Sequence, residues 1–257
     1  MAQAERRQSW WWLDQGSPLR RRGRWFPAPP MWHEGRARAE QRALLRDPVF
    51  AGIGVPDGDG RPVLVIPGFL AGDASTRGLR DWLSRVGYGP ERSGISLNVQ
   101  RSDALVAALA VRARALQARS GRAVTLVGHS RGGLLAKVLA DRNPELFDRV
   151  IALGSPLADP YDVHPLTLAA AQVVYVLNAG DRRWGRLTER RFLAELAAPT
   201  RVPVTSIYSR SDGVVNWRTC LRPDIEGIEV DGSHAGLVLN VEVYRQLARL
   251  LASEVSS

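Results

Sequence analysis

The sequence predicts an α/β domain built on a mostly parallel central sheet with helices on both faces. Three observations carry this prediction. Short apolar, β-branched segments alternate along the chain with longer segments of helical composition. The predicted strands are continuous apolar runs, which is typical of parallel strands buried on both faces. The chain has 257 residues, 45% of them hydrophobic and 24% charged, and is long enough to bury such a sheet.

The regular pattern begins near residue 61. Apolar runs bounded by Gly, Pro or Asp predict strands at 61–66, 123–127, 148–153, 202–208 and 227–230, with a short strand at 95–97. Helical composition predicts helices at 77–86, 104–119, 133–140 and 243–253, and two helical stretches, at 166–171 and 189–198, inside the long connection 157–200. We therefore expect a single α/β domain over residues 61–257 and an N-terminal extension over residues 1–60.

The N-terminal extension differs in composition from the rest of the chain. Residues 1–46 contain ten Arg against four acidic residues, and five of the eight Trp lie between residues 10 and 32. Two roles fit this composition: contact with a membrane surface, and packing of the tryptophans on the body of the domain. We favour packing, because the apolar residues cluster instead of repeating at helical spacing. No nucleic-acid-binding motif is recognisable, so we expect no nucleic-acid partner.

Composition also narrows the class of protein. No apolar run approaches the length needed to span a bilayer. The Arg pair at residues 6–7 is similar to the start of a twin-arginine export signal, but Asp14 and Arg20 interrupt the stretch that should be apolar, so we expect a cytoplasmic protein. The single cysteine, Cys220, cannot form an internal disulfide or a cysteine-cluster metal site, and we expect a packed side chain there.

The most informative motif is Gly128-His129-Ser130-Arg131-Gly132. An apolar strand precedes it and a helix follows it, so Ser130 stands at the apex of a strand–turn–helix unit. So sharp a turn leaves no room for Cβ atoms on the neighbouring residues, and the two glycines remove those clashes. Free N–H groups at the start of the following helix favour negative charge on the serine oxygen. The motif predicts a nucleophile elbow with Ser130 as the nucleophile.

A serine hydroxyl needs a base within hydrogen-bond reach and an acid that orients the base. His234 follows the last predicted strand and therefore lies at the carboxyl edge of the sheet, where the elbow also emerges. Asp212 follows the strand before it and is the expected acid. The other histidines and the rival acids are placed less well along the chain: His33, His129, His164, Asp159, Asp162 and Asp231.

Attack on a carbonyl carbon creates an oxyanion, which needs preorganised N–H donors. One donor is expected to be the backbone N–H of Arg131, the residue after the nucleophile. The second is expected from the loop that follows the first strand, where Gly68 permits close backbone approach. In that loop the N–H of Phe69 is the first choice and the N–H of Leu70 the second.

With these motifs the chain resembles the α/β-hydrolase superfamily, in its lipase/esterase-like branch, over residues 60–255. The segments that carry the resemblance are 63–69, 124–133, 153–156, 211–215 and 232–234, and the order Ser130, Asp212, His234 is that of the superfamily. The resemblance implies the α/β-hydrolase fold with a helical cap or lid at 157–200. It also implies a substrate site, for which we expect Leu70, His129 and Trp184.

Two positions depart from the pattern of that superfamily. Pro67 stands where many members have His before the oxyanion glycine, and Arg131 stands where many lipases have Met, Leu or Gln. Neither change removes a backbone donor. We expect Arg131 to place a cation near the acyl site and to alter substrate preference.

The residues and the resemblance together predict a serine hydrolase that cleaves a small-molecule or lipid carboxylic ester without metal or cofactor. Acyl transfer and hydrolysis of amides or thioesters use the same triad and stay open. A different class, a membrane-surface binding protein that uses the Arg/Trp-rich segment, also stays open. Because residues 1–47 contribute no triad member, we expect their deletion to change the rate on a small soluble ester by less than about tenfold.

Overall fold

A sheet of six parallel strands forms the centre of the molecule, in the order β2-β1-β3-β4-β5-β6. The computed structural model describes residues 31–177 and 182–253, and leaves the side chains of residues 175–188 undescribed. The strands are β1 (Pro62–Ile66), β2 (Gly89–Arg92), β3 (Val124–His129), β4 (Phe147–Leu153), β5 (Val204–Tyr208) and β6 (Glu226–Glu229). Every neighbouring pair is parallel, so the carboxyl ends of all these strands meet at one edge of the sheet.

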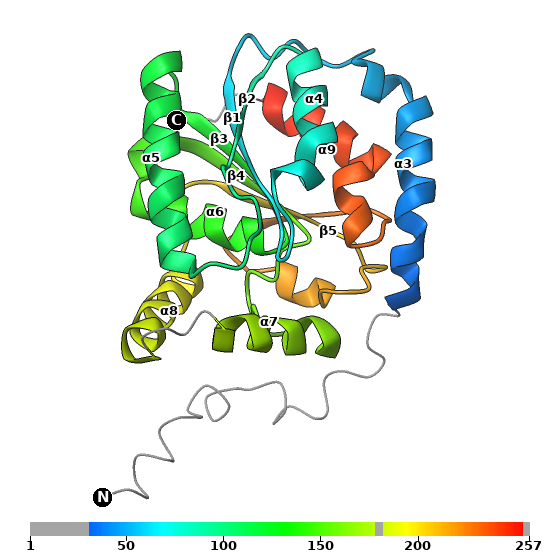
Figure 1. Cartoon of the computed structure of the whole chain (residues 1–257). Coiled ribbons are helices and arrows are strands. Elements are labelled where there is room, and N and C mark those ends of the chain that lie inside the picture. The colour runs from blue at the N-terminus through cyan, green and yellow to red at the C-terminus, as the bar shows by residue number, and fades with distance from the viewer. Residues whose placement is uncertain (1–30, 178–181, 254–257) are drawn as a thin grey trace, which may run out of the picture.

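Helices cover both faces of the sheet, as the sequence predicts (Figure 1). The α-helices are α3 (Ala37–Arg46), α4 (Arg77–Arg85), α5 (Ser102–Ser120), α6 (Arg131–Arg142), α7 (Pro165–Leu177), α8 (Arg182–Ala197) and α9 (Val241–Ala252). Short 3-10 helices connect them: η2 (Met31–Arg36), η3 (Pro48–Ala51), η4 (Asp73–Thr76), η5 (Pro144–Leu146), η6 (Trp217–Cys220) and η7 (Ala235–Leu239). None of the helices in the described part of the chain is long and apolar enough to cross a bilayer.

The alternating side chains of the strands pack into two hydrophobic cores, one on each face of the sheet. In β1, Leu64 and Ile66 join the core formed with α5, α6 and α8. Val63 and Val65 join the core formed with α3, α4 and α9. Because helices pack on both faces of the sheet and β2 and β3 cover its two edges, all five residues of β1 are buried. This is the physical reason that β1 is a continuous apolar run in the sequence.

Two elements differ from the sequence prediction. Residues 95–97 do not form a strand; β2 lies a few residues earlier, at Gly89–Arg92, and pairs with β1. The polar, Pro-containing segment of β2 is tolerated because β2 is an edge strand, where a missing N–H costs no ladder bond. The N-terminal segment is also more regular than its composition suggests, since η2 and α3 lie within it.

Residues 31–60 pack on the body of the molecule. Leu44 of α3 and Val49 of η3 are buried in the same core as α4 and α9. The indole of Trp82, which is fully buried, donates to the carbonyl oxygen of Val49 at 2.8 Å. Trp32, by contrast, is 80% exposed, so the packing of this segment does not depend on that tryptophan. The other tryptophans of the extension, at 10, 11, 12 and 25, lie outside the described residues.

The connection between β4 and β5 contains α7 and α8, close to the two predicted helical stretches. The end of α8 is anchored on the body, because Phe192 and Leu196 are buried in the core with α5 and α6. The fully buried ammonium of Lys137 in α6 donates to two carbonyl oxygens at that end, those of Glu195 and Ala198. Figure 1 shows α7 lying across the end of the sheet. That this connection acts as a cap or lid remains a prediction.

Candidate active site

Ser130 occupies a strained turn between β3 and α6. Its backbone angles are φ 53° and ψ −121°, a region that residues with a side chain rarely adopt. A Cβ on Gly128 would lie 2.5 Å from the backbone of Gly132, and one on Gly132 would lie 2.3 Å from the carbonyl oxygen of Ile66. Both glycines are therefore required by the close approach of β3, α6 and the end of β1. The predicted elbow geometry is present.

Asp212 and His234 form a buried hydrogen-bonded pair beyond the carboxyl ends of β5 and β6. The distance from Asp212 Oδ2 to His234 Nδ1 is 2.7 Å, and the two residues are 1% and 7% exposed. The other carboxylate oxygen, Oδ1, accepts the backbone N–H groups of Val214 and Val215 at 2.8 and 2.7 Å. The carboxylate is thus fixed by its own loop, and it fixes the imidazole.

The electrostatic environment favours a basic imidazole at position 234. Burial lowers the pKa of His234, but the Asp212 carboxylate outweighs burial and the net pKa is raised, with a smaller contribution from Glu34. The neighbouring His129 behaves in the opposite way. Burial and the positive charge on His234 lower the pKa of His129 to about 3, so this ring is neutral at any working pH. Of the two rings, only that of His234 has a pKa above the ordinary imidazole value, so it is the stronger base.

The pair lies beside the elbow. The ring of His129, the residue before Ser130, donates from Nε2 to the carbonyl oxygen of His234 at 3.0 Å, and the two ring centroids are 4.8 Å apart. Gly154, which follows β4, has φ 55°, and a Cβ there would come within 3.3 Å of both Asp212 Oδ2 and His234 Nδ1. The N–H of Ser130 donates to Leu153 at the end of the same strand, at 2.8 Å. The strand ends therefore bring a strained serine next to a carboxylate–imidazole pair.

The loop after β1 and the first residue of α6 offer the backbone donors expected of an oxyanion hole. In the described part of the chain no acceptor is found for the N–H groups of Phe69 and Arg131, whereas the N–H of Leu70 donates to Asn98 at 3.3 Å. A Cβ on Gly68 would lie 3.2 Å from the Cβ of Ser130, so this loop passes directly over the elbow. These contacts favour Phe69 over Leu70, although the role of both donors stays a prediction.

The side chain of Arg131 holds the loop at residues 66–70, which we call the oxyanion loop, through Asn98. Its guanidinium donates to Asn98 Oδ1 at 2.5 Å and to the carbonyl oxygen of Gln100 at 2.7 Å. Asn98, which is fully buried, in turn donates to the carbonyl oxygen of Pro67 at 2.8 Å. The cation that we expect near the acyl site is therefore engaged with protein oxygens, and its effect on substrate preference stays a prediction.

The rival residues have other partners. Asp162 accepts from the Asn216 amide, and Asp159 accepts from the N–H of Tyr161. His164 Nδ1 faces the N–H of Leu166 at the start of α7. His33 Nδ1 faces the carbonyl oxygen of Ser211, and Asp231 pairs with Arg36.

The remaining expected residues are placed as follows. Leu70, in the oxyanion loop, is 49% exposed, with φ 57°. His129 is engaged with His234, as described above. Trp184 lies in α8, and its side chain is outside the described part of the chain. Their contact with substrate remains a prediction. Cys220 is buried with Tyr208 and Val215, and burial raises the pKa of its thiol, in keeping with a packed side chain.

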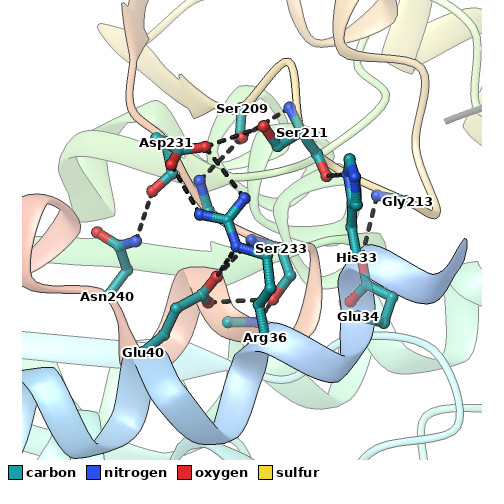
Figure 2. A network of polar contacts seen from close by, with 12 residues as sticks. His33, Glu34, Arg36, Glu40, Ser209, Ser211, Gly213, Asp231, Ser233 and Asn240 are labelled. Atoms are coloured by element: carbon teal, nitrogen blue, oxygen red, sulfur yellow. Dashed lines mark hydrogen bonds and ion pairs between the residues drawn. The ribbon is translucent and has the colours of Figure 1, made fainter. Parts of the chain in front are cut away.

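Sequence reasoning missed a group of N-terminal residues at this site. Figure 2 shows that Glu34 and Glu40, carried by η2 and α3, extend into the loops that bear Asp212 and His234. Roughly 180 to 200 residues separate these glutamates from their partners. Their types and spacing are those of an ordinary exposed helix face, so no sequence signal marks them. Among the described residues, no group of three or more His, Cys, Asp or Glu side chains could hold a metal ion.

Comparison with known proteins agrees with this fold. A family model described as alpha/beta hydrolase fold matches residues 82–193. The fold is similar to a lipase of Bacillus licheniformis, BlEst2 in mature form, with 16% identity, a TM-score of 0.55, and coverage of 77% of this chain and 94% of that one. It is also similar to a monoglyceride lipase of Saccharomyces cerevisiae in complex with a substrate analogue, with 17% identity, a TM-score of 0.55, and coverage of 79% and 91%.

A third similar structure is the Pyrococcus furiosus esterase Pf2001, with 15% identity, a TM-score of 0.54, and coverage of 77% and 85%. No curated protein matches the chain significantly in sequence. The chain has the α/β-hydrolase fold. The solved structures of this fold to which it is similar include a lipase, a monoglyceride lipase and an esterase.

Proposed function

We propose that this protein is a serine hydrolase that cleaves carboxylic esters through Ser130, His234 and Asp212. The observation that carries the proposal is the buried 2.7 Å hydrogen bond between Asp212 and His234, placed beside the strained Ser130 elbow. An elbow alone is a turn, and a buried Asp–His pair alone is a structural contact. Their meeting at one edge of the sheet supports nucleophilic catalysis.

In this mechanism Ser130 Oγ attacks the acyl carbon while His234 Nε2 takes the hydroxyl proton. The backbone N–H groups of Phe69 and Arg131 receive the oxyanion. His234 then passes the proton to the leaving alkoxide oxygen, the C–O bond breaks, and an acyl-serine ester remains. Water attacks that ester with His234 again acting as the base, which releases the acid and restores the serine. Asp212 holds the imidazole and stabilises its charged form throughout.

The residues around the site support an ester with an apolar acyl group. Leu70, in the oxyanion loop, is 49% exposed, and α7 carries Leu166 and Val173, which are 64% and 58% exposed. Residues just before α7 contact the loop after β5, through the bridge between Val163 and Val215. Exposed apolar side chains on the oxyanion loop and on α7 favour a small-molecule or lipid ester over a charged substrate.

The test is hydrolysis of p-nitrophenyl esters of graded chain length by the wild type and by Ser130→Ala. Without the nucleophile only binding and the oxyanion donors remain, so we expect kcat to fall by at least about 10³-fold. A fluorophosphonate probe should label the wild type and not the variant. Retention of more than about a tenth of the activity by the variant would exclude Ser130 as the nucleophile, since a factor of ten is only about 1.4 kcal/mol of barrier.

Acyl transfer and cleavage of thioesters or amides use the same residues, so the panel should include them. Each acyl donor is offered with and without an added alcohol. A product that forms only with the added alcohol would identify a transferase and contradict ester hydrolysis as the main reaction.

A further inference from the structure

The carboxylate of Glu34 is bound to both of the loops that hold the acid and the base. We define the acid loop as residues 209–215 and the base loop as residues 231–236. Glu34 Oε1 accepts the N–H of Gly213 at 3.0 Å and the N–H of His234 at 2.9 Å, and Oε2 accepts the N–H of Ala235 at 2.8 Å. One side chain from η2 therefore links the residue after Asp212 to His234 itself.

Glu40 holds the base loop about two helical turns further along the same segment. Its carboxylate accepts the N–H of Ser233 at 2.9 Å and the Ser233 hydroxyl at 3.0 Å. The contact requires glycine at 236, because a Cβ there would lie 1.4 Å from Glu40 Oε2. Ser233 is fully buried, so Glu40 is the protein partner that satisfies its polar groups.

Arg36 lies between the two glutamates in sequence and joins the base loop from its outer side (Figure 2). Its guanidinium pairs with Asp231 at 2.7 Å. Asp231 also accepts the Ser211 hydroxyl of the acid loop at 2.9 Å. Through Arg36 and the two glutamates, the segment 34–40 thus contacts the base loop at several residues, and Glu34 also contacts the acid loop.

Three direct hydrogen bonds also join the two loops: that of the Asp212–His234 pair, that from the Ser211 hydroxyl to Asp231, and that from the N–H of Gly232 to the Ser209 hydroxyl at 3.1 Å. Glu34 adds to them a side chain from outside both loops, which binds the backbone on either side of the catalytic pair. Asp212 and His234 lie beyond the ends of β5 and β6, after the ladder bonds between those strands stop. A carboxylate that accepts two N–H groups on one oxygen fixes the distance between the peptide units that carry them. Misplacement of a catalytic group by about 1 Å costs on the order of 100-fold in rate.

We infer that Glu34, supported by Glu40, is a positioning residue for the catalytic pair: it clamps the acid loop to the base loop and so sets the approach of His234 to Ser130. This inference rests on the proposed function. It assigns a role in catalysis to a segment that contributes no triad member. Neither glutamate is placed to take part in bond making, because both are fully engaged with backbone or hydroxyl donors of the loops.

Glu34 also acts on the imidazole through its charge. The charged and titratable groups that face His234 from the surrounding elements are Asp212, His129 and Glu34, with Glu40, Arg36 and Asp231 further along the base loop. Loss of the Glu34 charge removes one of the groups that raise the pKa of His234. A merely structural contact far from the base would not have this effect.

The experiment compares Glu34→Ala, Glu34→Gln and a control, Glu91→Ala, in the full chain. Glu91 lies on β2, away from both loops, and forms an ion pair with Arg119 of α5. For Glu34→Ala we expect kcat on a soluble ester to fall about 10- to 100-fold, with KM within about threefold, because no substrate contact is removed. For Glu91→Ala we expect kcat within about twofold of the wild type.

Glu34→Gln separates positioning from charge. Its amide oxygen can still accept from Gly213 and His234, so we expect it to recover most of the lost kcat. Because the charge is gone, the acid limb of its pH–kcat/KM profile should move to lower pH, and an NMR titration should show the same shift for the His234 ring. Amide hydrogen exchange at 213, 234 and 235 should be faster in Glu34→Ala and close to wild type at 213 and 234 in Glu34→Gln.

The readouts distinguish failure of the inference from failure of the proposed function. The inference is overturned if folded Glu34→Ala keeps kcat within twofold of the wild type. If Glu34→Ala does not fold, Glu34→Asp, which keeps the charge and shortens the side chain, takes its place, and kcat within twofold of the wild type overturns the inference instead. If the wild type hydrolyses no ester and Ser130 takes no fluorophosphonate label, the proposed function fails, while the exchange and NMR measurements still decide whether Glu34 clamps the loops.

Discussion

At the residue scale, the two oxygens of Asp212 are used differently. Oδ1 is fixed by the N–H groups of Val214 and Val215, and Oδ2 faces His234. The backbone of the acid loop therefore holds the carboxylate in a single orientation. An asparagine at position 212 would keep the shape of the side chain and lose its charge, so it tests whether the charge that faces His234 is needed for catalysis.

We predict that Asp212→Asn lowers kcat/KM by about 10²- to 10⁴-fold, because an amide cannot both orient the imidazole and stabilise its charged form. The sign of the pH effect follows from the raised pKa of His234. The base works when neutral, so activity is lost as pH falls through that pKa, and removing Asp212 should move the acid limb to lower pH. A pH series of kcat/KM measures both effects. Asp159→Asn is the control, and an equal loss there would contradict the assignment of the acid.

Arg131 supports a second prediction at this scale. Its guanidinium is partly buried, which lowers its pKa, and it reaches the oxyanion loop through Asn98. We predict that Arg131→Met lowers kcat by about tenfold or more, because Asn98 then holds the Pro67 carbonyl less firmly and the Phe69 donor loses its position. Steady-state kinetics of the variant measure this, with Arg119→Met as the control. A rise in KM alone, with kcat unchanged, would point instead to direct contact between Arg131 and substrate.

At the element scale, the junction of β1, β3 and α6 depends on two glycines, and α4 offers a glycine of opposite character. A Cβ on Gly132 would lie 2.3 Å from a carbonyl oxygen of β1, whereas nothing lies within 4 Å of a Cβ on Gly78. We predict that Gly132→Ala lowers the free energy of unfolding by about 3 kcal/mol or more. Gly78→Ala should raise it by about 0.5–1 kcal/mol, because helical alanine loses less entropy on folding. Urea denaturation of both variants measures this contrast, and equal effects would contradict it.

The elements that the sequence predicted best are those whose pattern is set by local packing. Apolar runs mark β1, β3 and β4 because both faces of these strands are buried, and the elbow is marked by glycines that the turn itself requires. The strand β2 was misplaced because an edge strand of Gly, Pro, Glu and Arg has no such pattern. Its position is set by pairing with β1, which is a tertiary contact.

The same reasoning explains which parts of the site could be predicted. Ser130, Asp212 and His234 each follow a strand, so chain position alone places them at one edge of the sheet. The contribution of Glu34 could not be predicted, because its partners lie about 180 to 200 residues away and its own sequence context is an ordinary charged helix. The engagement of Arg131 with Asn98 depends likewise on a loop that carries no motif.

At the scale of the whole molecule, the N-terminal segment runs from the catalytic edge to the opposite end of the sheet (Figure 1). At one end Glu34 and Glu40 contact the catalytic loops, and at the other Leu44 and Val49 enter the core with α4 and α9. Asp47, which lies between Leu44 and Val49 in sequence, forms an ion pair with Arg245 of α9. These contacts argue for a larger effect of deleting residues 1–47 than the change of less than about tenfold that the sequence led us to expect.

We predict that two N-terminal truncations behave differently. A chain that begins at Met31 keeps Glu34 and Glu40 and should retain kcat/KM on a soluble ester within about threefold. A chain that begins at Pro48 loses both glutamates and the buried Leu44, so its activity should fall by at least about 100-fold. Its free energy of unfolding should also fall by about 2–5 kcal/mol or more, from the loss of Leu44 alone. Ester kinetics and urea denaturation measure the two effects.

Full-length Leu44→Ala separates stability from positioning in this comparison. It removes core packing and leaves the glutamates in place, so it should lower the free energy of unfolding while kcat, measured well below the melting temperature, stays near the wild-type value. If the chain that begins at Pro48 folds and keeps full activity, the N-terminal segment is dispensable for positioning. If the chain that begins at Met31 loses activity only on vesicle-borne esters, and added salt causes the same loss in the full chain, residues 1–30 act by contact with an anionic membrane surface.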